Sequence, residues 1–281
     1  MPEPDISSVE FQRSLQRDRK LINLNSEFKS IGFFTRGVRL NKREGIAGDV
    51  YLGFLRDKPV AIKMADDYIS ASQIPYFYNE RNFLLGQEVK PLEVFLPNLN
   101  FDVRIEFSEL EREMMDSPFM PPETMVSKFA PISLEGDIKL PLPIHMATWL
   151  SWAKMLDRLK IYKDGYMMDS QPDDLRLSFE RVGTRCQLKV VKIDCVPVYN
   201  DRETERDICW QIIDNMREML GSALPNHMRD MASIHNKPQR LEVLIGILEK
   251  GVREAPELSQ DEIEKLLGAS KRMINKNGDW V

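Results

Sequence analysis

Residues 167–177 read Met167-Met168-Asp169-Ser170-Gln171-Pro172-Asp173-Asp174-Leu175-Arg176-Leu177, a polar loop that runs into an alternating apolar strand. The strand would hold the loop's two carboxylates, Asp169 and Asp174, in fixed positions. Such a pair suits a proton acceptor beside a metal ligand. The alternative is an ordinary turn, because Asp and Pro are common turn formers. The first interpretation requires a phosphate-binding segment, a cation and a second metal carboxylate elsewhere in the chain.

Composition narrows the class of protein. The chain has 281 residues, 42% of them hydrophobic, which is enough for one large domain or two lobes. Its formal charge of -5 gives no reason to expect nucleic-acid binding. The three cysteines form no CxxC pair, which favours reduced thiols in the cytoplasm and disfavours zinc. Because neither a signal peptide nor a membrane span is visible, we expect a soluble, cytoplasmic protein.

A glycine-containing hairpin is predicted over residues 45–63. The stretch Gly45-Ile46-Ala47-Gly48-Asp49-Val50-Tyr51-Leu52-Gly53 is followed by a turn at 56–59 and by Val60-Ala61-Ile62-Lys63. Backbone N–H groups of such a hairpin can bind phosphate oxygens, and Lys63 can direct its ammonium at them. The alternative is that the glycines serve turn geometry alone.

A helix is predicted over residues 70–85, with Pro75 in its first turn. Glu80 lies among its apolar positions. It would either face solvent or pair with a buried cation, for which Lys63 is the natural partner. Such pairing would fix one rotamer of the lysine.

The remaining segments follow the same periodicity rules. Residues 175–179 and 186–193 predict a hairpin that ends at Asp194, the second carboxylate that a metal site requires. Residues 125–131 predict a strand that leaves the sheet as a linker, whose backbone could hydrogen-bond a flat base. Further strands are expected at 94–96 and 103–107, and helices at 7–24, 144–161, 203–220, around 228–233, at 240–249 and at 261–273.

Taken in order, these segments resemble a protein kinase over roughly residues 35–250. Val60-Ala61-Ile62-Lys63 is identical to the V-A-I-K motif of that family. Residues 45–51 resemble the end of the glycine-rich loop, and Tyr78-Asn79-Glu80 resembles the centre of helix αC. Residues 169–174 resemble D-L-K-P-E-N of the catalytic loop, and Lys192-Ile193-Asp194 resembles the strand entering D-F-G.

The resemblance implies a site for ATP and Mg²⁺. Lys63 would bind the α- and β-phosphates, Glu80 would orient Lys63, and Asp169 would accept the proton of a substrate hydroxyl. Asp194 would hold Mg²⁺, and Asp174, where the family has asparagine, would be a second metal ligand. The nucleotide-binding residues would be Gly45, Ala47, Gly48, Val50, Ala61, Lys63, Val126 and Lys128.

Several positions depart from the family pattern. Met167-Met168 replaces His-Arg, so regulation by a phosphorylated activation loop is not expected. Gln171 replaces a lysine that would stabilise the transferring phosphoryl group. Cys195-Val196 replaces Phe-Gly, and no A-P-E follows, which predicts a very short activation segment and a reduced C-lobe.

The resemblance implies an α+β, bilobal protein kinase-like fold. Residues 1–34 would form a helical extension, 35–127 a β-rich N-lobe with helix αC, and 128–281 a mainly helical C-lobe. The leading functional hypothesis is an atypical kinase that phosphorylates a protein. The alternatives are a pseudokinase that binds nucleotide as a scaffold, and an enzyme that modifies a small molecule or transfers AMP. A bacterial or viral effector acting in the host cytosol would also fit this pattern.

Overall fold

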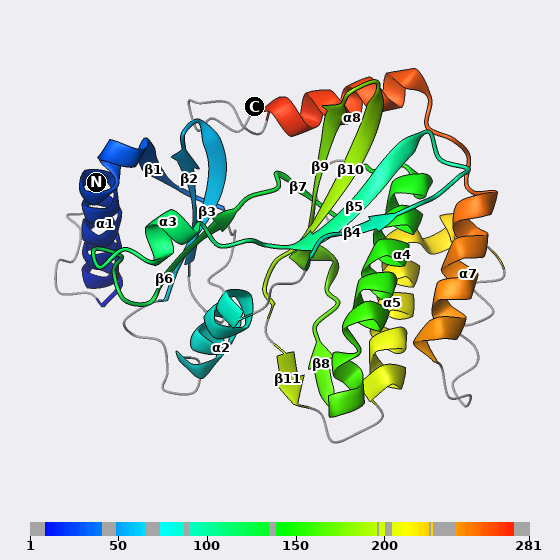
Figure 1. Cartoon of the computed structure of the whole chain (residues 1–281), viewed down its shortest axis with the longest axis horizontal. Coiled ribbons are helices and arrows are strands. Elements are labelled where there is room, and N and C mark those ends of the chain that lie inside the picture. The colour runs from blue at the N-terminus through cyan, green and yellow to red at the C-terminus, as the bar shows by residue number, and fades with distance from the viewer. Residues whose placement is uncertain are drawn as a thin grey trace. The chain divides into compact units, whose positions relative to one another are not determined.

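The structure, a computed structural model, describes residues 9–40, 49–65, 74–86, 90–134, 139–195, 197–199, 204–224, 226 and 240–272. These residues divide into two compact units. Unit 1 holds the described residues within 9–86 and 108–129, and unit 2 holds those within 90–107 and 130–272. Figure 1 shows the elements of both.

Unit 1 is built on an antiparallel sheet with the strand order β1-β2-β3-β6. Its strands are β1 (Phe33–Arg39), β2 (Asp49–Leu55), β3 (Lys58–Met64) and β6 (Thr124–Lys128). The predicted hairpin is present as β2 and β3. Its turn residues Arg56 and Asp57 have φ values of 51° and 66°. Positive φ at both central positions is the pattern of a type I′ hairpin turn, whose twist matches that of the flanking strands.

Three helices belong to unit 1: α1 (Val9–Glu27), α2 (Ile74–Gly86) and the single-turn α3 (Arg112–Met115), with a short 3-10 turn at Lys29–Ile31. The helix predicted over 7–24 is α1, which packs beside β1. Leu24 of α1 is fully buried in one cluster with Phe33 and Ile62. This helix therefore covers an edge of the core of unit 1.

Unit 2 contains a five-stranded mixed sheet with the order β4-β5-β10-β9-β7. Its strands are β4 (Leu92–Val94), β5 (Phe101–Phe107), β10 (Arg185–Lys192), β9 (Leu175–Val182) and β7 (Ile132–Ser133). β9 and β10 form the predicted hairpin around Gly183, whose φ is 63°.

The placement of residues 90–107 differs from the expected first lobe. β5 pairs in parallel with β10 along its whole length, from Phe101 opposite Cys186 to Phe107 opposite Lys192. Phe101, Val103 and Ile105 are buried, so this pairing carries part of the core of unit 2. Short-range periodicity predicts the strand, but a parallel partner so distant in sequence leaves no local signal.

Helices complete unit 2: α4 (Leu142–Leu159), α5 (Thr204–Leu220), α7 (Leu241–Glu254) and α8 (Gln260–Arg272). α4 and α7 run side by side, and α8 lies along β9 (Figure 1). The smaller elements are the 3-10 turns Ile161–Asp164, η3 (Pro172–Asp174) and Gly221–Ala223, and a two-stranded ribbon of β8 (Tyr166–Met168) and β11 (Pro197–Tyr199).

The core of unit 2 is centred on α4. Its residues from Pro143 to Ala153 are all buried, with Trp149 and Trp152 fully so. A helix that is apolar on all sides belongs inside a core rather than on its surface. Pro143 near the start suits the first turn, and Lys160 in the left-handed region ends the helix.

The chain is thus an α+β protein with one antiparallel and one mixed multistranded sheet in its described residues. The predicted helices at 144–161, 203–220, 240–249 and 261–273 are present within a few residues. Ser259 and Glu262 form a capping box at the start of the last of these helices. The helix expected around 228–233 lies outside the described residues. Among the helices described, none has the length and apolar character needed to cross a membrane.

Candidate functional site

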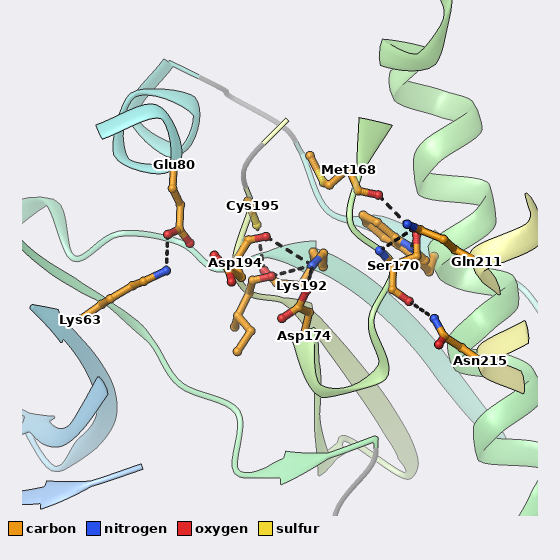
Figure 2. A network of polar contacts seen from close by, with 12 residues as sticks. Lys63, Glu80, Met168, Ser170, Asp174, Lys192, Asp194, Cys195, Gln211 and Asn215 are labelled. Carbon is orange, nitrogen blue, oxygen red and sulfur yellow. Dashed lines mark hydrogen bonds and ion pairs between the residues drawn. The ribbon is translucent and has the colours of Figure 1, made fainter. Parts of the chain in front are cut away.

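Lys63 and Glu80 form an ion pair within unit 1. Nζ of Lys63 lies 2.6 Å from Oε2 of Glu80, and the side chains are 17% and 5% exposed. Glu80 is buried, whereas its neighbours Tyr78 and Asn79 on α2 are exposed. The pair therefore fixes the described part of α2 to β3, as Figure 2 shows. The predicted partnership is confirmed, and the solvated alternative for Glu80 is wrong.

Three residues expected to bind nucleotide share one face of the unit 1 sheet. Val50 lies directly opposite Lys63, and Ala61 lies two residues before Lys63 on β3. Residues opposite each other in an antiparallel pair, and residues two apart on a strand, point to the same face. Val60, Ile62 and Met64 face the core instead. The sheet thus brings Val50, Ala61 and Lys63 together. Gly45, Ala47 and Gly48 lie outside the described residues.

The backbone groups of Val126 and Lys128, which were expected to bind a base, are hydrogen-bonded to other residues of unit 1. The Val126 carbonyl accepts a bond from the Glu111 N–H at 2.8 Å, and the Lys128 N–H donates to the Glu109 carbonyl at 2.9 Å. The Val126 N–H donates to Met115 Sδ, and the Lys128 carbonyl accepts from the Ser108 hydroxyl. These backbone groups are already bonded, so a base could bond to them only by displacing or sharing partners.

Asp169 lies in the loop between β8 and η3. Its side chain is exposed, and within the described part of the chain it has no hydrogen-bond or ion-pair partner. An exposed, unpaired carboxylate is available to accept a proton from a substrate hydroxyl.

The residue after Asp169 anchors this loop to two helices of unit 2. Ser170 is fully buried, and Trp152 Nε1 of α4 donates to its hydroxyl at 2.9 Å. From α5, Asn215 Nδ2 donates to the Ser170 carbonyl at 2.8 Å, and Gln211 Oε1 accepts from the Ser170 N–H at 3.3 Å. Buried polar groups that are fully bonded hold one geometry, so these contacts fix the loop at Ser170, the residue next to Asp169. Figure 2 shows Ser170 with Gln211 and Asn215.

Asp174 is paired with a buried lysine. Nζ of Lys192 lies 2.8 Å from Asp174 Oδ2, and the side chains are 0% and 13% exposed. Burial is the largest cause that raises the pKa of Asp174 to about 7. Attraction by Lys192 lowers this pKa, and repulsion from Asp194 raises it. Burial opposes the charge of Lys192, but Asp174 and neighbouring groups outweigh it and raise the lysine pKa. A raised pKa favours the charged form of Lys192.

Asp194 follows directly after β10. Its side chain is exposed, and its φ of 53° places it in the left-handed region. Non-glycine residues with positive φ are uncommon and gather at functional sites, with Asp among the more tolerant residues. Cys195 is fully buried, and its Sγ lies 3.3 Å from the Lys192 carbonyl.

The two expected metal ligands differ in how well they suit a hard cation. Asp194 offers an exposed carboxylate, which is a suitable ligand for Mg²⁺. Asp174 offers a carboxylate whose Oδ2 is bound to an ammonium. Among the described residues, no group of three or more His, Cys, Asp or Glu side chains is arranged so that it could hold a metal ion. Any Mg²⁺ here would take few protein ligands, as this ion commonly does when it binds substrate phosphates.

Sequence reasoning missed the residues that support the loop. Every second residue of β10 from Cys186 to Val190 is buried, and Lys192 falls on the same face. A lysine on a buried strand face was therefore the sequence signal that it needs a partner. Gln211 and Asn215 are one helical turn apart on α5, a spacing that can support one loop.

No family model matches the chain, and no curated protein matches it.

Proposed function

We propose that this protein has a protein kinase-like fold and is an atypical kinase that transfers the γ-phosphate of ATP to a hydroxyl group on a protein. The observation that carries the proposal is the pair of Lys63 and Glu80. A lysine on the sheet face shared with Val50 and Ala61 is held in one rotamer by a buried carboxylate. This is a suitable arrangement for a cation that binds phosphate oxygens.

The chain's own residues would then have distinct tasks. Lys63 binds and orients phosphate oxygens, and Glu80 keeps its ammonium in place. Asp169 accepts the proton that leaves the attacking hydroxyl. Asp194 would hold Mg²⁺, which neutralises charge on the phosphates when it is bound. The anchored Ser170 keeps Asp169 in a fixed position.

Labelled ATP tests the type of transfer. The chain is incubated with an acceptor protein such as casein, Mg²⁺, and ATP labelled at either the γ- or the α-phosphate. Phosphoryl transfer predicts protein-bound label from γ-labelled ATP alone. Label from α-labelled ATP would instead indicate AMP transfer, and label only on a small molecule would exclude a protein acceptor. Asp169→Asn is the matched variant, because it keeps the shape of the side chain and removes its basicity.

A scaffold that binds nucleotide without turnover is the second candidate. It is favoured by the bonded backbone of Val126 and Lys128, by the exposed Gln171 in place of a loop lysine, and by the pairing of Asp174 with Lys192. The discriminating result is stabilisation of the chain by ATP and Mg²⁺ in a thermal melt without labelled product in any fraction.

A further inference from the structure

Lys192 is surrounded by oxygen atoms in the way that a bound cation would be. Its ammonium lies 2.8 Å from Asp174 Oδ2, 2.8 Å from the Ile193 carbonyl and 3.4 Å from the Asp194 carbonyl. An ammonium has three N–H donors, and these three oxygens provide an acceptor for each. Figure 2 shows Lys192 beside Asp174 and Asp194.

The position of this charge is fixed by the fold. Lys192 is the last residue of β10, it is fully buried, and its Nζ lies 5.8 Å from the ring centroid of Trp152. The face of an aromatic ring attracts a cation, and the same Trp152 is held through its indole N–H by Ser170. The lysine therefore cannot move into solvent without breaking contacts to α4 and to the loop that carries Asp169.

We propose that the Lys192 ammonium is a built-in cation that takes the place of a metal ion at Asp174. A divalent cation at Asp174 would lie next to a fixed positive charge in a buried setting, where repulsion between like charges is strong. The charges also balance. With Asp174 ionised, aspartate in place of asparagine adds one negative charge at residue 174 and Lys192 adds one positive charge, so the pair is neutral.

The inference rests on the proposed function and deepens it. In the nucleotide complex the chain would hold one divalent cation, at Asp194, and Asp174 would bind none. Asp174 was expected from the sequence to be a metal ligand, and its contact with Lys192 argues against that role. Lys192 is a positioning residue in this account, because it acts on the phosphates only through the charge it places near Asp194.

Counting bound Mn²⁺ tests the inference without any measurement of turnover. Mn²⁺ is titrated into a mixture of the full chain and the ATP analogue AMP-PNP. The chain is in excess over AMP-PNP, so that all nucleotide is bound. Free Mn²⁺ is measured by EPR. Wild type should bind one Mn²⁺ per nucleotide. The double variant Lys192→Met/Asp174→Asn removes both charges together, which keeps the fold free of an unpaired buried charge. It should bind two, because a neutral oxygen ligand then replaces the ion pair.

Lys189→Met is the matched control. Lys189 lies on the same strand and pairs with Glu106 at 2.6 Å, but it does not contact Asp174. Its loss should leave the count at one. Two Mn²⁺ per nucleotide in wild type, or one in the folded, nucleotide-bound double variant, would overturn the inference and leave the proposed function standing. Failure of wild type to bind labelled AMP-PNP in equilibrium dialysis would instead overturn both.

Discussion

Glu80 Oε2 lies 2.6 Å from Lys63 Nζ, and the glutamate side chain is 5% exposed. A buried carboxylate on a helix is stable only when its charge is compensated, so the helix and the strand constrain each other through this pair. The pair gives Lys63 a fixed direction on the sheet face that it shares with Val50 and Ala61.

Lys63→Met should lower phosphate transfer by about 100-fold or more, because a preorganised cation at the transferring group is removed. The thermal stabilisation by ATP and Mg²⁺ should also fall. The control is Lys58→Met on the exposed start of the same strand, which should change neither quantity. Equal rates for wild type and Lys63→Met would exclude a role of Lys63 in transfer.

Asp169→Asn should slow transfer by about 10²–10⁴-fold, the usual contribution of a positioned general base. Nucleotide binding should remain, because Asp169 is exposed and unpaired in the described part of the chain. The thermal shift with ATP is measured beside the rate. Asp173→Asn in the same loop is the matched control and should keep the wild-type rate. A variant at Asp169 that transfers label as fast as wild type would remove Asp169 from the mechanism.

Asn215→Ala should both destabilise the chain and slow transfer. It leaves the buried Ser170 carbonyl without its 2.8 Å donor, which costs about 1–3 kcal/mol of the free energy of unfolding. The control is Asn25→Ala, which breaks two hydrogen bonds to Thr35 within unit 1. Urea unfolding should register both substitutions. Initial rates should fall only for Asn215→Ala, and equal effects on the rate would make Asn215 purely structural.

Stability should depend on pH through His145. Burial lowers the pKa of His145 from 6.5 to about 4, so the unfolded chain takes up the proton first as pH falls. The stabilising contribution is complete above pH 6.5 and is lost as pH falls towards 4, by up to about 3 kcal/mol.

The comparison with His145→Leu isolates this group, since other titrations occur in both proteins and cancel in the difference. Urea unfolding is measured at intervals between pH 7.5 and pH 4.5. Wild type should lose stability relative to the variant as pH falls. A difference that stays constant over this range would contradict the assignment.

Local patterns predicted the elements of this chain better than their pairing. The β2–β3 hairpin, α2 with Pro75 in its first turn, α4 and the capping box at Ser259 follow from periodicity and terminal residues. The parallel pairing of β5 with β10 could not be predicted from such patterns. Register between strands so distant in sequence depends on which apolar faces meet in three dimensions.

Of the ion pairs formed by Lys63 and by Asp174, the sequence predicted the first and not the second. The pair of Lys63 and Glu80 could be predicted, because a lysine on an alternating strand and an acid on an apolar helix surface each need a partner. The pairing of Asp174 with Lys192 could not, since both residues have obvious alternative roles when read singly. Their contact depends on the hairpin register that brings Leu175 opposite Lys192.

Intact-mass analysis after incubation with ATP and Mg²⁺ is the most direct test of the proposed phosphotransfer. Casein is included as an acceptor, and wild type is compared with Asp194→Asn at equal concentration. The account predicts mass increases of one or more phosphoryl groups on casein or on the chain itself with wild type, and none with Asp194→Asn. Unchanged masses with folded, ATP-bound wild type, or equal increases with both proteins, would contradict it.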